Sequence, residues 1–200
     1  ALERGASRVD AVELDPAMVE LVRGRFAGFS GHLYQRPEVR VHLAEARGFV
    51  AGTDERWDLI QVALLDSFSA SAAGVHALSE SHLYTVEALG AFVDRLAGDG
   101  VLAITRWLEV PPRGSLKLFA TAVEALEMVG VDDPGGRLAL IRSWKTATLL
   151  VKASPWSAEE LAAIREFAEK RWFDLAWMPD MEAGEANRFN FWDEPHLYRG

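Results

Sequence analysis

The stretch that decides the fold is "RVDAVELDPAM", Arg8 to Met18, in which a strand pattern gives way to the start of a helix. The run RVDAVEL predicts a strand. Asp15 then fits the N-cap of a helix, and Pro16 fits its first turn. Apolar residues follow at helical spacing, which predicts an amphipathic helix that ends near Gly28; they are Met18, Leu21, Val22 and Phe26.

The same alternation of strand and helix continues along the chain. Further strands are predicted at 39–44, at 57–66 and at 101–107, and the helices between and after them are predicted at 45–52, 82–96 and 115–128. We expect Gly98–Gly100 to stop the helix at 82–96. The apolar run Leu59–Leu65 predicts a strand that is covered on both faces. Alternating strands and helices of this kind are typical of βαβ units around a parallel sheet.

The C-terminal part departs from this alternation. Residues 137–144 and 146–153 predict an antiparallel pair of strands joined through Lys145, and Ser157 fits the cap of a further helix. The sequence therefore predicts an α/β fold with a doubly wound, mostly parallel sheet and an antiparallel C-terminal strand pair. We expect one domain over 1–179, followed by an irregular tail over 180–200.

Composition narrows the range of functions. The chain has 200 residues and a formal net charge of -9, which argues against nucleic acid or an anionic membrane surface as the main partner. The absence of cysteine excludes thiolate metal sites and disulfides and fits a reducing compartment, so we expect a cytoplasmic protein. His76 and His82 lack a second ligand at i+4, so no metal site is expected. The tryptophans predict core or subunit contacts, and a homodimer is the candidate assembly.

Three acids follow predicted strands, and ligands of open α/β sheets bind at the carboxyl ends of strands. A carboxylate in the position of Glu13 suits the two hydroxyls of a ribose. Glu45 opens a short helix and is a candidate for the amino group of an adenine, or simply a favourable charge at the helix N-terminus. Asp15, in contrast, is sufficiently explained as a helix cap.

Asp66 directly follows an apolar strand. Partial desolvation there would raise the pKa of its carboxyl group and suit it to accept a proton. The alternative is that Asp66 bonds the backbone amides of the following loop.

A glycine-rich turn should precede the ribose acid by roughly 20 residues. Only twelve residues precede Glu13, and they contain no such turn. We therefore expect the first strand and the glycine loop to lie upstream of Ala1 in a longer parent protein.

The order of the segments "VELDP", "RPEVRVHLAEAR", "WDLIQVALLDS", "ALSESHLYTVEAL" and "LAGDGVLAITRW" resembles the spermidine synthase family, and in particular its divergent bacterial members, some of which are fused to membrane-spanning segments. The resemblance covers about Val9 to Trp107. It implies a class I methyltransferase-like, Rossmann-like fold. It also implies aminopropyl transfer from decarboxylated S-adenosylmethionine to a small-molecule amine.

The resemblance assigns roles residue by residue. Glu13 would hold the ribose of the co-substrate, and Glu45 with Ala46 would contact its adenine. Asp66 and Ser67 match the start of the family's D-S-S/T-D-P loop, whose first aspartate helps to deprotonate the attacking amine. If the parent carries membrane-spanning segments, this domain is expected on the cytoplasmic side.

Two departures from the family keep other functions open. The family's G-D-G/A step is "AEA" here, and Ser69 stands where a second loop aspartate is expected. One alternative is a methyltransferase that uses S-adenosylmethionine itself, since both reactions share the fold and the ribose acid. The other alternative is a nucleoside-binding domain without catalytic activity.

Overall fold

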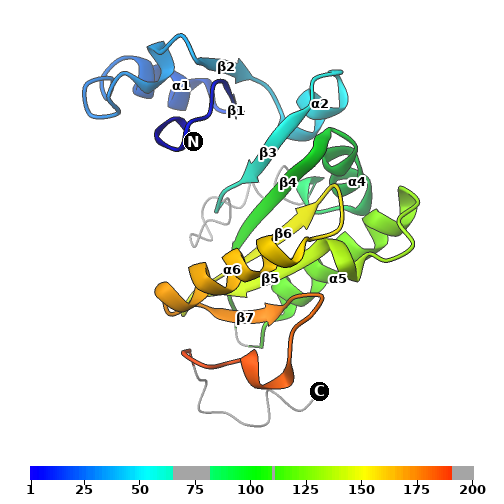
Figure 1. Cartoon of the computed structure of the whole chain (residues 1–200). Helices are drawn as coiled ribbons and strands as arrows, with labels where there is room; N and C mark the ends of the chain where they lie inside the picture. The colour runs from blue at the N-terminus through cyan, green and yellow to red at the C-terminus, as the bar shows by residue number, and fades with distance from the viewer. Residues whose placement is uncertain (65–81, 110, 191–200) are drawn as a thin grey trace. The chain divides into compact units, whose positions relative to one another are not determined.

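The structure is a computed structural model that describes residues 1–64, 82–109 and 111–190 (Figure 1). The chain divides into two compact units, Ala1–Thr53 and Asp54–Gly200, which we call unit 1 and unit 2. Asp66, Ser67 and Ser69 lie outside the described residues.

Unit 1 is built on a parallel pair of strands. Its elements in chain order are η1 (Leu2–Arg4), β1 (Val9–Glu13), α1 (Pro16–Arg23), η2 (Leu33–Gln35), β2 (Val39–Leu43) and α2 (Ala46–Ala51). The register runs from Val9 opposite Val39 to Glu13 opposite Leu43. Both strands and both helices lie within a few residues of their predicted ranges, so the strand-to-helix interpretation of the opening stretch is confirmed.

The start of α1 follows the prediction more closely than its packing. Asp15 Oδ1 accepts the backbone N–H of Ala17 at 2.8 Å, and Pro16 occupies the first turn. The helix ends at Arg23, about one turn before the predicted end. Its predicted apolar face is wrong, since Met18 is 47% exposed and the buried helical residue is Val19. The reason is geometric, because a two-stranded sheet covers only a narrow strip of a helix.

Unit 2 contains a five-stranded sheet with the order β3-β4-β6-β5-β7. β3 and β4 are parallel, and the remaining neighbours are antiparallel. The elements are β3 (Trp57–Val62), α4 (Val86–Asp94), β4 (Leu96–Trp107), α5 (Arg113–Met128), η4 (Gly135–Arg137), β5 (Leu138–Arg142), β6 (Thr146–Lys152), α6 (Ala158–Lys170), β7 (Asp174–Trp177) and η5 (Ala183–Glu185). The predicted antiparallel strand pair is β5 and β6.

Two expectations about this sheet are corrected. The helix predicted at 82–96 is shorter at both ends. Thr85 caps α4 at its start, and Leu96 already belongs to β4, so Gly98–Gly100 do not end the helix. The strand predicted to be covered on both faces is open on one of them. Leu59 is 51% exposed, and Gln61, which points to the same face two residues further on, is also exposed.

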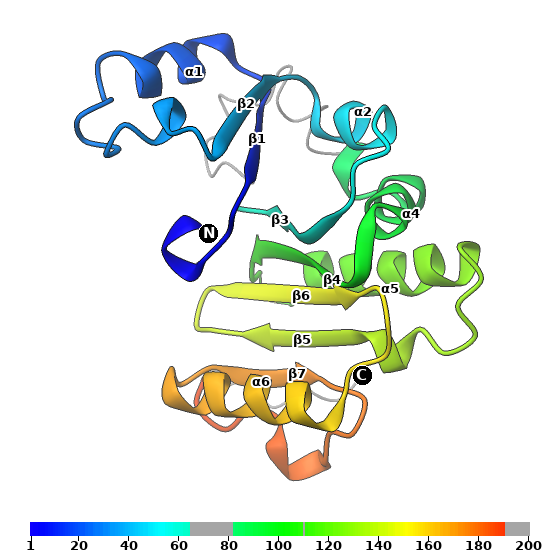
Figure 2. The same ribbon diagram turned by 45° about the horizontal axis from the view of Figure 1, so that its top comes forward.

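Helices cover both faces of the five-stranded sheet (Figure 2). Leu161 and Ala168 of α6 join one core cluster with Ala139 and Ile141 of β5. Leu140 points to the opposite face, and there Phe119 of α5 contacts Trp177, which is the register partner of Leu140. This arrangement confirms the doubly wound prediction for unit 2.

Candidate functional site

The two acids that sequence analysis placed at a nucleoside lie at one edge of unit 1. Glu13 ends β1, and Glu45 follows β2, which runs parallel to β1. The backbone N–H of Ala44 donates to the backbone oxygen of Glu13 at 3.0 Å, which continues the ladder to the ends of both strands. The carboxyl ends of two neighbouring parallel strands therefore present both acids at the same edge.

One oxygen of the Glu13 carboxylate accepts hydrogen bonds from the neighbouring backbone. Its Oε1 accepts the N–H of Leu14 at 2.8 Å and that of Asp15 at 3.0 Å. No hydrogen bond to Oε2 is formed by the residues that the structure describes. One oxygen thus fixes the orientation of the carboxylate, and the other can accept from a ligand hydroxyl.

In the Glu45 carboxylate, in contrast, both oxygens accept hydrogen bonds from backbone N–H groups. Oε1 accepts the N–H of Arg47 at 2.9 Å, and Oε2 accepts that of Gly48 at 2.7 Å. Glu45 is therefore the N-cap of α2, with Ala46 as the first helical residue. This arrangement agrees with the alternative in which Glu45 is a favourable charge at the N-terminus of a helix. Each oxygen of the Glu45 carboxylate can accept a second hydrogen bond, so the capping role does not prevent a contact with an adenine. The adenine contacts of Glu45 and Ala46 stay predictions.

A buried charge lies on the same strand pair and was missed by sequence reasoning. The side chain of Asp10 is only 7% exposed, and it pairs with Arg8 at 3.1 Å and with His42 Nε2 at 2.9 Å. The His42 ring in turn packs on Phe49 of α2, with 4.4 Å between the ring centroids. Only the strand register, which places His42 opposite Val12, could have revealed this pair.

In unit 2, the carboxyl ends of three strands lie at one edge of the sheet, the kind of edge at which open α/β folds bind ligands. β3 is parallel to β4, and β5 points the same way as β4 because both are antiparallel to β6. The predicted catalytic acid, Asp66, follows β3 and lies outside the described residues, as does Ser67. The described residues at this edge include Arg106 near the end of β4 and Arg142 at the end of β5.

Both arginines are held by neighbours. The Arg106 guanidinium lies over the ring of Tyr84, 4.4 Å from its centroid. Arg142 Nη2 donates to Asn187 Oδ1 and to the Asn190 backbone oxygen, both at 2.7 Å, and lies 3.1 Å from Asp174 Oδ2. With side chains 8% and 0% exposed, Arg142 and Asp174 form a buried ion pair.

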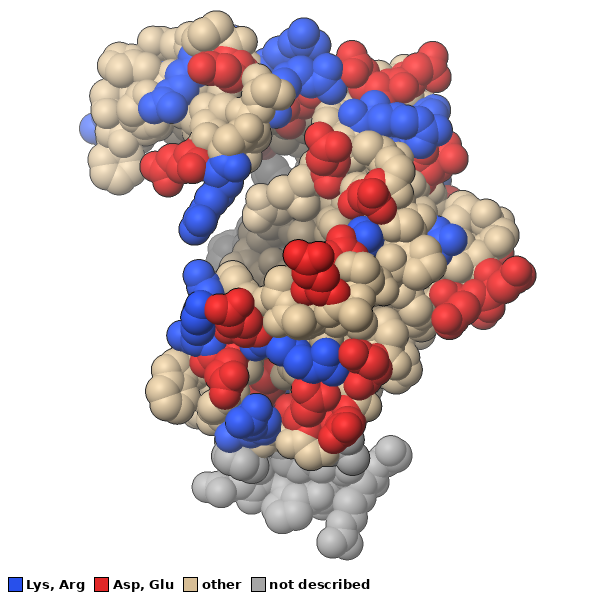
Figure 3. All heavy atoms as spheres, in the orientation of Figure 1, with Lys and Arg blue, Asp and Glu red and all other residues tan. Residues whose placement is uncertain are grey.

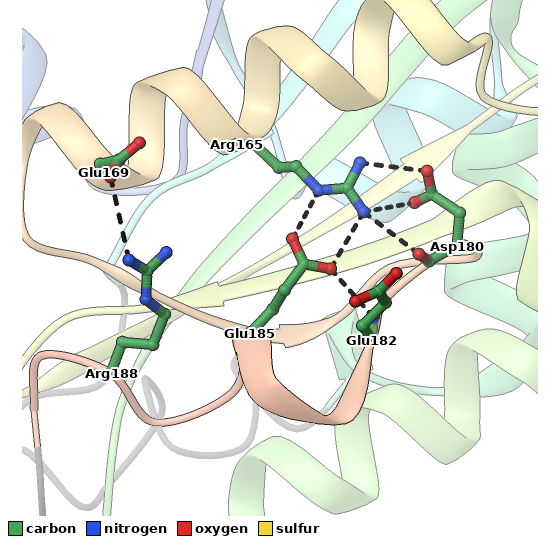
Figure 4. Close-up of polar contacts among 6 residues, drawn as sticks. All are labelled: Arg165, Glu169, Asp180, Glu182, Glu185 and Arg188. Atoms are coloured by element: carbon green, nitrogen blue, oxygen red, sulfur yellow. Dashed lines mark hydrogen bonds and ion pairs between the residues drawn. The ribbon is translucent and has the colours of Figure 1, made fainter.

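A second ionic network ties the segment after β7 to α6 (Figure 4). Arg165 of α6 contacts Glu185 at 2.7 Å and Asp180 at 2.9 Å. The hydrogen bond from Arg165 and the one from the backbone of Glu182 lower the pKa of Glu185 to about 2. Figure 3 shows basic and acidic side chains interspersed over this part of unit 2. We interpret the network as structural, because the Arg165 guanidinium is bound by two carboxylates of the chain itself, those of Glu185 and Asp180.

Over residues 1–64, 82–109 and 111–190, no group of three or more His, Asp or Glu side chains is placed to hold a metal ion. Within the same ranges, every helix is too short or too polar to cross a bilayer.

Comparison with known proteins identifies the fold. No protein-family model matches the sequence, and no curated protein matches it. Among solved structures, the chain is similar to a spermidine synthase in complex with the transition state analogue AdoDATO, with 13% identity, a TM-score of 0.51, and coverage of 96% of this chain and 59% of that one. A probable spermidine synthase from Corynebacterium glutamicum gives 19% identity and a TM-score of 0.52, covering 80% of this chain and 53% of that one.

A methyltransferase gives a similar match. Human methyltransferase-like protein 13 in complex with SAH has 18% identity and a TM-score of 0.53, covering 82% of this chain and 70% of that one. At such identities the likeness establishes the fold alone, and the chain spans less than two thirds of the length of the two spermidine synthases. The fold is therefore Rossmann-like and similar to that of class I methyltransferases, as predicted.

Proposed function

We propose that this domain is a transferase that uses a sulfonium nucleoside, decarboxylated S-adenosylmethionine, and moves its aminopropyl group to an amine. The observation that carries the proposal is Glu13 at the end of β1, oriented by two backbone amides and with Oε2 available. An acid in this position suits the ribose hydroxyls. The structures in complex with AdoDATO and with SAH support a co-substrate of this type.

The proposed chemistry requires a base. The lone pair of the amine attacks the carbon next to the sulfonium, and a new C–N bond forms as the C–S bond breaks. The electron pair of the C–S bond moves to sulfur, which leaves as the neutral thioether methylthioadenosine. The proton of the amine passes to a carboxylate, for which Asp66 is the candidate because it follows the apolar strand segment in the sequence and matches the first aspartate of the family's loop.

A methyltransferase is the second candidate, and the fold match with human methyltransferase-like protein 13 favours it. In that reaction a nucleophilic atom of the acceptor would attack the methyl carbon of S-adenosylmethionine instead. Ser69, which replaces the second loop acid that would hold a cationic amine, favours the third candidate, a nucleoside-binding domain without catalytic activity.

The test is calorimetry of the full-length protein with S-adenosylmethionine, with its decarboxylated form and with methylthioadenosine, followed by product analysis with primary amines. We expect decarboxylated S-adenosylmethionine to bind more tightly than S-adenosylmethionine and to give an aminopropyl product. A methylated product would select the second candidate. Absence of binding by all three ligands would exclude both enzymes.

The catalytic assignment is tested separately. Asp66→Asn should abolish turnover and largely preserve nucleoside affinity, because the amide cannot accept the proton. Unchanged turnover would remove Asp66 from this role. Nucleoside binding without any turnover in the wild type would instead favour the non-catalytic nucleoside-binding domain.

A further inference from the structure

Two tryptophans at one end of the sheet of unit 2 are largely exposed. Trp144, in the turn between β5 and β6, is 66% exposed, and Trp172, in the turn between α6 and β7, is 70% exposed. Arg142 of β5 lies opposite Asp174 of β7. Trp144 follows the first of these residues by two positions, and Trp172 precedes the second by two. Both turns are therefore at the same end of the sheet, at the left in Figure 2.

Trp172 has a backbone conformation that tryptophan rarely adopts. Its φ is 57°, in the left-handed region. The N–H of Phe173 donates to the backbone oxygen of Ala168 at 2.9 Å. The N–H of Trp172 donates to the backbone oxygen of Glu169 at 3.2 Å, which completes a Schellman motif at the end of α6. Glycine is usual at this position, because a Cβ there is strained. A tryptophan therefore makes the folded chain less stable, and its ring contacts Phe189 only edge-on, at 5.4 Å between the ring centroids.

Exposed cations stand next to both tryptophans. Lys145 follows Trp144, Arg171 precedes Trp172, and both basic residues are exposed. Neither basic side chain forms an ion pair with any residue that the structure describes. The guanidinium of Arg171 instead lies over the ring of Phe167, 4.0 Å from its centroid. We call Trp144, Lys145, Arg171 and Trp172 the tryptophan patch. A surface that carries both cations and exposed rings is complementary to itself, because cations are attracted to the faces of aromatic rings.

The exposed area of the two rings is large enough to contribute to an assembly. A tryptophan side chain buries up to about 250 Å², so the exposed parts of Trp144 and Trp172 amount to roughly 340 Å². In a contact between two copies these residues alone would bury roughly 700 Å², against about 1,200–2,000 Å² for a stable interface. Tryptophan and arginine are also among the residues that are enriched at interfaces and that contribute most to binding.

We propose that the tryptophan patch is the contact between two copies of this chain, related by a twofold axis. In such a contact the same surface of each copy meets the other, so a cation of one patch stacks on a ring of its partner. Burial of the Trp172 indole in the dimer then offsets the strain of its left-handed backbone. A dimer of this kind suits a transferase and a non-catalytic domain alike, so it does not depend on the proposed function.

The test is sedimentation equilibrium of the full-length protein over a range of concentrations. We expect the wild type to form a dimer. Trp172→Gly should raise the dissociation constant of the dimer by about tenfold or more, because tryptophans at the centre of an interface contribute this much. Trp144→Ser should have a similar effect, and Arg171→Gln should raise the dissociation constant by a few fold. Phe29→Ser is the matched control, because it removes a ring that is 94% exposed in unit 1. Its dissociation constant should stay within about twofold of the wild type.

Urea unfolding distinguishes an interface role of Trp172 from a structural one. The wild type and Trp172→Gly are compared at a concentration at which both are monomers, so that dissociation does not shift the midpoint. Trp172→Gly should keep or raise the urea midpoint, since glycine relieves the left-handed strain and this offsets the lost contact with Phe189. A clearly lower midpoint would mean that Trp172 stabilises the monomer, and it would overturn the inference.

A wild type that stays monomeric at every concentration would also overturn the inference. So would an unchanged dissociation constant in both tryptophan variants, or an equal increase in Phe29→Ser. Vesicles made of equal parts of phosphatidylcholine and phosphatidylglycerol test another occupant, since exposed tryptophans and cations also suit a membrane surface. A monomeric wild type that sediments with these vesicles, when Trp172→Gly does not, would assign the tryptophan patch to a membrane instead of a second copy.

Discussion

The backbone N–H of Ala44 donates to the backbone oxygen of Glu13 at 3.0 Å, so the ladder between β1 and β2 extends to the last residue of each strand. This contact brings Glu13 and Glu45, which are far apart in sequence, to one edge of unit 1. Their carboxylates then differ in use. Both oxygens of Glu45 accept the N–H groups at the start of α2, whereas in Glu13 only Oε1 accepts backbone N–H groups and Oε2 is available.

Glu13→Gln should lower nucleoside affinity by about tenfold or more, because a hydrogen bond to a charged acceptor contributes about 1.5–3 kcal/mol. Calorimetry with methylthioadenosine measures the effect. Glu20→Gln is the matched control, since it removes the same charge from an exposed position on α1. Equal affinity of the wild type for ribose and 2′-deoxyribose ligands would contradict the ribose role.

Asp15→Ala should lower the stability of the fold and not the nucleoside affinity, the reverse of the expectation for Glu13→Gln. Loss of the N-cap contact to Ala17 should lower the free energy of unfolding by about 1 kcal/mol, as is usual for such caps. Nucleoside affinity should stay within about twofold of the wild type. Urea unfolding and calorimetry on the same samples provide both numbers. A larger loss of affinity than in Glu13→Gln would mean that the two acids have been assigned the wrong way round.

The local signals in the sequence were sufficient for most elements. Asp15 and Pro16 predicted the start of α1, and Ser157 predicted the start of α6, where the capping box with Glu160 is formed. These features depend on neighbouring residues only. The pair formed by His42 and Asp10 could not be predicted in the same way, because it depends on strand register across 32 residues of sequence.

Gly100→Ala should destabilise the protein by about 1–3 kcal/mol, the usual range for overpacking. A Cβ there would lie 2.7 Å from the backbone oxygen of Trp57 and 3.0 Å from the backbone nitrogen of Ala97, and backbone atoms cannot move aside easily. Gly98→Ala is the matched control in the same strand, since a Cβ at Gly98 meets nothing within 4 Å. Equal urea midpoints for the two variants would contradict the prediction.

These glycines also explain an error of sequence interpretation. The run "GDG" is typical of a helix stop, and from the sequence alone it predicts the end of the helix at 82–96. In the structure the run lies inside β4, and Gly100 is required by the close approach of β3. A glycine needed for close approach and a glycine that ends a helix have the same local sequence signal, so only the tertiary contact distinguishes them.

Asp174→Ala should be far more destabilising, by about 3–5 kcal/mol, because it leaves the buried Arg142 charge without its carboxylate. It also removes the acceptor of the backbone N–H groups of Phe189 and Asn190, at 2.8 and 2.9 Å. Asp132→Ala, at an exposed position, should change the free energy of unfolding by less than about 0.5 kcal/mol. A loss below about 1 kcal/mol in Asp174→Ala would show that the ion pair matters little.

Stability should fall in acid through Glu185. The pKa of Glu185 is lowered to about 2 by the hydrogen bond from Arg165, whereas an unfolded glutamate titrates near 4.3. A carboxyl group with a lowered folded pKa stabilises the protein above its unfolded pKa, and this contribution is lost as the pH falls towards 2. The contribution of an ion pair this exposed should stay below about 1 kcal/mol, since solvent screens it.

The measurement is the free energy of unfolding from urea titrations at several pH values between 6 and 2. Glu185→Gln should flatten part of the acid limb and lower stability at pH 6. Part of the remaining acid loss should come from Glu160, whose pKa is lowered by its hydrogen bond from Lys152. Asp99 and Glu166, whose pKa values are lowered by hydrogen bonds from Ser154 and Lys170, should also contribute. Glu124→Gln, at an exposed position on α5, should leave the profile unchanged. A Glu185→Gln profile parallel to the wild type over the whole range would show that Arg165 does not stabilise the folded protein through this carboxylate.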